Sequence, residues 1–76
     1  MPLERSDYES WAKHLVNDHV RTIIVADIGL FFDHRENATR NAMYRLTQLH
    51  FFIGDDHPDE NGLIQRLDQH NLLKTV

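Results

Sequence analysis

One apolar run, Thr22 to Phe32, constrains the fold of this chain more than any other feature of its sequence, and Asp27 is the only charge within it. Wound as a helix, the run is apolar on all sides, and such helices are usually enclosed by protein. As a strand it would lack a partner, because no other segment has strand character. We therefore predict a buried central helix over 22–32. The alternative is a strand over 22–28 that pairs with the same strand of a second copy.

The chain is short for enclosing an element of this kind. Its 76 residues form one domain, 1–76, without any cysteine to cross-link it. Cores of that size supply only about 3–5 kcal/mol. The run is too short for a membrane span, which takes ~20 apolar residues. We therefore expect a homodimer in which a second copy covers part of the run, with a dimer core formed by Ile23, Ile24, Asp27, Ile28 and Phe31.

Capping patterns and apolar stripes predict further helices around the central one. Ser6 and Glu9 have the spacing of a capping box, and Asp33 and Glu36 repeat it before a second stripe. Gly54 suits a left-handed helix end. The predicted fold class is an all-α single domain, a small bundle of about four helices over 6–19, 20–32, 34–53 and 58–73.

Composition limits the classes of partner. Hydrophobic residues make up 41% and charged residues 26%, which is typical of a globular chain rather than a disordered one. The net charge of −4 does not favour nucleic acid or an anionic membrane. Residues 1–5 show no signal-peptide pattern, and the absence of cysteine fits a reducing compartment. We expect a cytoplasmic protein.

Six histidines suggest a metal site, but none stands three or four residues from another, the spacing that a helical ligand pair needs. Ser10, His14 and Asp18 have the order of a catalytic triad, yet we expect them on a solvated helix face without oxyanion donors. We predict no catalytic site, no cofactor and no metal. A small histidine and carboxylate metal-binding protein remains an alternative.

Asp27 is costly to bury unless its carboxylate is paired or hydrogen-bonded. We expect it to point outward or to meet an arginine such as Arg21. The alternative is a buried switch or a specificity device at a dimer interface.

Tyr44 and Phe51 stand seven residues apart, opposite the apolar stripe of the third predicted helix, with Met43 beside them. Exposed aromatic residues at this spacing can anchor a protein partner, although they could instead pack under the first or last helix. We take these three residues as the candidate partner-binding site. The sequence predicts a non-catalytic protein–protein interaction module, a small homodimeric regulator or inhibitor of a larger protein.

A helix-turn-helix-like DNA-binding regulator is the second alternative, because a turn at Gly54 separates the last two predicted helices. Its weakness is electrostatic. Asp55, Asp56, Asp59 and Glu60 lie where phosphates would approach, and phosphate neutralisation supplies most non-specific affinity for DNA.

Overall fold

The computed structural model describes residues 3–74 and consists of four α-helices joined by short connections. α1 spans Arg5–Lys13, α2 spans Asp18–Asp33, α3 spans Arg40–Gly54 and α4 spans Glu60–Gln69, with a 3₁₀ turn η1 over Arg35–Asn37. The all-α prediction is confirmed. Residues 3–74 contain no strand, so the alternative of a strand over 22–28 is wrong. The predicted ranges 6–19, 34–53 and 58–73 were each too long, whereas α2 extends beyond 20–32 at both ends.

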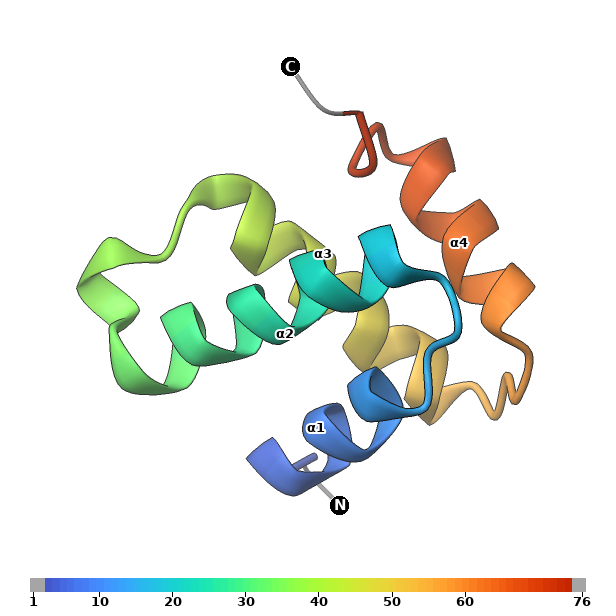
Figure 1. Ribbon diagram of the computed structural model, residues 1–76, viewed down its shortest axis with the longest axis horizontal. Helices are drawn as coiled ribbons and strands as arrows, with labels where there is room; N and C mark the ends of the chain where they lie inside the picture. The colour runs from blue at the N-terminus through green and yellow to red at the C-terminus, as the bar shows by residue number, and fades with distance from the viewer. Residues whose placement is uncertain (1–2, 75–76) are drawn as a thin grey trace.

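α2 is the central element of the fold. It packs against both α1 and α3, and Figure 1 shows it running across the molecule with α4 at one end. Its buried apolar residues Val20, Ile24 and Ile28 share one hydrophobic core with residues from the rest of the chain: Ala12, Leu15, Leu46, Leu49, Phe52, Leu63, Leu67 and Leu72. Its other side stays open, since Val25 is 52% exposed. No helix within residues 3–74 has both the length and the apolarity that a membrane crossing demands.

α1 begins one residue earlier than predicted and ends sooner. Glu4 is the N-cap, and its backbone N–H donates to the Asp7 carboxylate at 2.6 Å, which replaces the expected pairing of Ser6 with Glu9. The chain leaves the helix at His14. Val16 is therefore 83% exposed in the connection to α2 and does not extend the apolar stripe of α1.

The N-cap predicted for the third helix is displaced. Asp33 is the last residue of α2 and binds Arg5, so it does not cap α3. Thr39 does so instead, because its Oγ1 accepts from the backbone N–H of Ala42 at 3.0 Å. Asp59 caps α4. The segment after Asp33 is thus a short connection rather than the first turns of the third helix.

The turn between α3 and α4 depends on Asp56 rather than on Gly54. Asp56 has φ of 61°, whereas Gly54 ends α3 without a positive φ. Aspartate tolerates this left-handed conformation because its short side chain can hydrogen-bond locally. Gly62 in α4 lies against Phe52, where an added Cβ would be 3.1 Å from the ring. Gly62 therefore permits the close approach of α4 to α3.

Candidate protein-interaction surface

The outer face of α3 has more large exposed apolar side chains than any other helix within residues 3–74. Met43 is 47% exposed, and Tyr44 and Phe51 are each 52% exposed. They lie opposite the buried side of the helix, which consists of Ala42, Leu46, Leu49 and Phe52. Of the two arrangements considered from the sequence, the structure has the exposed one.

A regular stripe runs along this face. Arg40, Tyr44, Thr47, Phe51 and Gly54 follow one another at intervals of four, three, four and three residues, and all five are exposed. This alternation places side chains on one seam of a helix in coiled-coil packing. The Thr47 hydroxyl donates to the Met43 carbonyl at 2.9 Å, so it needs no other partner. We call these five residues the α3 seam, and their spacing suits contact with another helix.

A hollow of about 280 Å³ adjoins the seam, lined by Tyr44, Gln48, His70 and Leu72. Leu72 belongs to the segment that follows α4. Arg45 holds this segment in place, because its Nη1 donates to the Leu72 carbonyl at 3.4 Å. A partner could therefore insert an apolar side chain beside the Tyr44 ring.

The two ends of the seam differ in charge. Arg40 stands at its N-terminal end, and Asp55 and Asp56 follow its C-terminal end. Asp55 lies 3.6 Å from Arg66 of α4, whereas Arg40 and Asp56 take part in no ion pair within residues 3–74. A positive and a negative end are thus both available to a partner.

A buried ion pair fixes α3 against α2. Arg45 donates from Nε to Asp27 Oδ2 at 2.6 Å and from Nη2 to Oδ1 at 3.0 Å, and Asp27 is only 2% exposed. Burial raises the pKa of Asp27 more than the hydrogen bonds and charge of Arg45 lower it. An arginine partner was expected, but Arg21 was the wrong one, since it binds Asp18 and the Leu15 carbonyl.

The residues predicted as a dimer core are largely covered within one chain. Ile24, Asp27 and Ile28 are buried, and Ile23 and Phe31 are partly exposed. The three buried residues are inaccessible to a second copy while the chain is folded. The buried side of the central run is therefore covered within one chain, and a homodimer remains a prediction.

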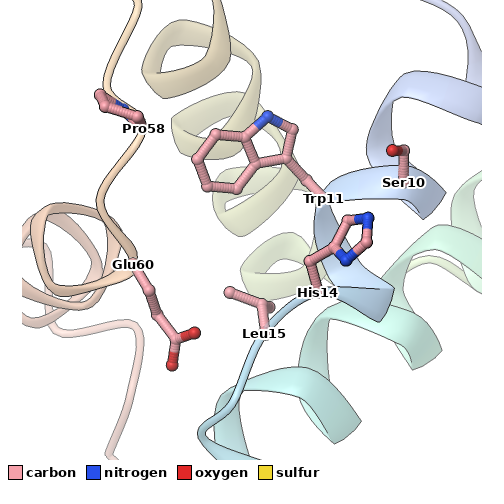
Figure 2. A pocket seen from close by; sticks show the side chains of 6 residues that line it. All are labelled: Ser10, Trp11, His14, Leu15, Pro58 and Glu60. Carbon is pink, nitrogen blue, oxygen red and sulfur yellow. The ribbon is translucent and has the colours of Figure 1, made fainter.

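A second hollow, of about 300 Å³, lies between α1 and the turn before α4 (Figure 2). Ser10 and His14 line it together with Trp11, Leu15, Pro58 and Glu60. Asp18 is not among these residues and binds Arg21 instead. The structure thus does not bring Ser10, His14 and Asp18 together as a triad.

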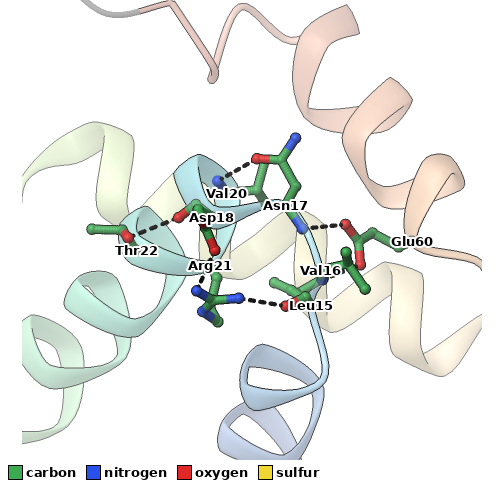
Figure 3. Close-up of polar contacts among 8 residues, drawn as sticks. All are labelled: Leu15, Val16, Asn17, Asp18, Val20, Arg21, Thr22 and Glu60. Atoms are coloured by element: carbon green, nitrogen blue, oxygen red, sulfur yellow. Dashed lines mark hydrogen bonds and ion pairs between the residues drawn. The ribbon is translucent and has the colours of Figure 1, made fainter.

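The Glu60 carboxylate of this hollow ties α4 to the connection between α1 and α2. It accepts from the backbone N–H groups of Val16 at 2.7 Å and Asn17 at 2.9 Å (Figure 3). Asn17 in turn caps α2, since its side chain accepts from the N–H of Val20 at 3.0 Å. Reasoning from the sequence missed this role because both partners are backbone groups, which no residue pattern reveals.

His50 and His57 contact aromatic side chains rather than groups that would bind a metal ion with them. His50 Nδ1 lies 3.0 Å from the Tyr8 hydroxyl, and the His57 ring stacks on Phe52 with centroids 5.0 Å apart. Across residues 3–74, no group of three or more histidine or carboxylate side chains is placed to hold a metal ion. The alternative of a metal-binding protein gains no support from this geometry.

The charges around α4 do not favour DNA. Arg66 is the only basic residue of α4, and it pairs with Asp55. Asp56 and Asp59 flank the turn that leads into the helix. Because basic groups must face the phosphates of DNA, the electrostatic objection to a helix-turn-helix function applies to the folded chain as well.

Comparison of the chain with protein-family models, with curated proteins and with solved structures found no match. A function is therefore inferred from the geometry of the surface.

Proposed function

We propose that the chain is a non-catalytic protein–protein interaction module and that the α3 seam, with Met43 beside it, is its contact surface. The observation that carries the proposal is the heptad-spaced exposure of Tyr44 and Phe51 opposite the buried side of α3. Large aromatic side chains are enriched at protein interfaces, where a few of them supply most of the binding free energy.

The packing of α3 against the core supports the same function. Leu46 and Leu49 on the buried side of α3 pack into the core, and the Asp27–Arg45 pair sets the helix against α2. A surface that is ordered before binding loses little conformational freedom on association, so more of the contact energy appears as affinity.

The proposal is tested by the size of the assembly that contains the chain in a cell lysate. We expect the wild-type chain, loaded at a concentration high enough to keep a weak complex associated, to elute from a sizing column in an assembly heavier than one chain. Tyr44→Ala/Phe51→Ala should release it as a free chain with an unchanged helical circular-dichroism spectrum, because the substitutions lie outside the core.

Val16→Ala/Val25→Ala is the matched control, because it removes exposed apolar groups that lie away from α3. This variant should elute with the wild-type protein. A free wild-type chain, or a Tyr44→Ala/Phe51→Ala variant that stays in the assembly, contradicts the proposed function.

A further inference from the structure

We propose that the occupant of the α3 seam is a second copy of this chain, whose α3 lies antiparallel to the first. The inference rests on the proposed function, because it names the partner of the same surface. Symmetric dimers are the commonest protein assemblies, and their interface must be complementary to itself. The α3 seam meets that requirement in its aromatic residues, in its charges and in its shape.

The aromatic residues match across a two-fold axis. With two antiparallel α3 helices centred between Thr47 and Gln48, Tyr44 of each copy faces Phe51 of the other. Thr47 lies close to the axis, where a small side chain with a satisfied hydroxyl allows the helices to approach. One register thus forms two aromatic contacts and leaves the centre free of bulk.

The charges select the same register. Arg40 of one copy comes to lie against Asp55 and Asp56 of the other, and the symmetry repeats this contact at the opposite end of the seam. A parallel arrangement would set Arg40 against Arg40 and acid against acid. Since juxtaposed like charges disfavour an interface, the charge distribution favours the antiparallel dimer.

The hollow beside Tyr44 fits this arrangement as well. Phe51 of the second copy arrives at Tyr44, next to the 280 Å³ hollow that His70 and Leu72 help to line. An apolar side chain in a hollow of this kind is the usual form of an interface anchor. Because a single helix seam is a small interface, we expect a dissociation constant on the order of micromolar.

The test is a charge reversal followed by mixing, with association of the purified chain measured by analytical ultracentrifugation. Arg40→Glu alone and Asp55→Lys/Asp56→Asn alone should each weaken association by about tenfold or more, because acid then faces acid or base faces base. Asparagine is used at position 56 because it tolerates the positive φ found there.

An equimolar mixture of the two variants should largely restore association, because an acidic and a basic side chain then meet at both ends of a mixed antiparallel pair. Lys13→Glu and Glu36→Gln/Asp68→Lys change the net charge by the same amounts at exposed residues that do not belong to the seam, and each should associate like the wild type. Circular dichroism checks that every variant is folded.

The inference is overturned if the reversed variants associate as the wild type does, or if mixing restores nothing. It is also overturned if the purified wild-type chain stays monomeric at millimolar concentration. In that case, an elution in lysate that still depends on Tyr44 and Phe51 means that another protein occupies the seam, and the proposed function stands. If the purified chain stays monomeric and its elution in lysate does not depend on Tyr44 and Phe51, the proposed function is overturned as well.

Discussion

The carboxylate of Asp27 on α2 and the guanidinium of Arg45 on α3 lie side by side in the interior, joined by hydrogen bonds of 2.6 and 3.0 Å. Arg45 also donates a hydrogen bond to the carbonyl of Leu72, in the segment that follows α4. One ion pair therefore sets the positions of α2, α3 and the segment that borders the hollow at Tyr44. The orientation of the α3 seam depends on it.

Removal of one member of this pair should be strongly destabilising. Arg45→Met leaves the Asp27 carboxylate buried without its partner, which costs about 3–5 kcal/mol. A loss of that size approaches the whole stability of so small a domain. Urea unfolding followed by circular dichroism should show Arg45→Met largely unfolded at 25 °C.

The double variant Asp27→Leu/Arg45→Met removes both charges and should regain most of the lost stability, since a buried pair replaced by apolar residues is often neutral. If the urea midpoint of Arg45→Met equals that of the wild type, the Asp27–Arg45 pair does not hold α2 and α3 together.

The two acids Asp27 and Asp33 should titrate on opposite sides of their ordinary pKa of 3.8. Burial raises the pKa of Asp27, whereas the hydrogen bonds and charge of Arg5 lower the pKa of Asp33. Carbon-13 NMR of the side-chain carboxyl groups measures both midpoints. A midpoint of Asp27 below that of Asp33 would contradict the burial of Asp27 and the pairing of Asp33 with Arg5.

The free energy of unfolding should depend on pH as the opposite pKa shifts of Asp27 and Asp33 require. The folded state binds the proton of Asp27 more tightly than the unfolded state, so the contribution of Asp27 to the free energy of unfolding rises as the pH falls through its folded pKa and levels off below 3.8. The contribution of Asp33 is present above 3.8 and is lost as the pH falls through its lowered pKa. The difference in urea midpoint between wild type and Asp33→Asn should therefore shrink at acid pH, and a difference that grows there would disprove this assignment.

Glu60→Gln should loosen the connection between α1 and α2. The substitution removes the charge that accepts from Val16 and Asn17, and hydrogen bonds to a charged group contribute about 1.5–3 kcal/mol. Amide hydrogen exchange at these two residues should accelerate by about tenfold or more. Glu36→Gln, an exposed control, should leave both rates unchanged, and unchanged rates in Glu60→Gln would show that the carboxylate does not hold the connection.

Two glycine substitutions should act in opposite directions. Gly29 lies within α2 with nothing within 4 Å of an added Cβ, so Gly29→Ala should stabilise the chain by about 0.5–1 kcal/mol. Gly62→Ala should destabilise it, because the added Cβ would lie 3.1 Å from the Phe52 ring, which is 1% exposed and already contacts the rings of Trp11 and His57.

Overpacking of this kind typically costs about 1–3 kcal/mol, more than alanine gains in helix propensity. Thermal unfolding of the two variants measures both effects. If Gly62→Ala raises the melting temperature, α4 does not pack against Phe52 as described.

The sequence was sufficient to predict the all-α fold and to place Tyr44 and Phe51 opposite the apolar stripe of their helix, but it left open whether they are exposed or pack under the first or last helix. Both predictions follow from helical periodicity, which places these residues opposite Leu46 and Leu49 whatever the packing of the other helices. The helix boundaries were less predictable. Ser6 with Glu9 and Glu4 with Asp7 obey the same local capping rule, and the rule alone does not choose between them.

The contacts that hold the helices together could not be obtained from local patterns. Arg45 lies 18 residues from Asp27, and Glu60 lies 44 residues from Val16, so only the packed chain brings them together. Which side of the central run is covered by the chain itself could not be read from the sequence for the same reason. An all-round apolar pattern does not show which side is buried, and the structure buries Ile24, Asp27 and Ile28 but leaves Val25 52% exposed.

The most direct measurement is site-specific photo-crosslinking in living cells, with a photoreactive phenylalanine in place of Phe51, an exposed aromatic residue of the α3 seam. We expect a covalent adduct heavier than one chain, at twice its mass if the partner is a second copy. The same group in place of Asn61, an exposed residue of α4, should form no adduct. If position 51 yields no adduct, or both positions yield it equally, the α3 seam is not the contact surface of this protein.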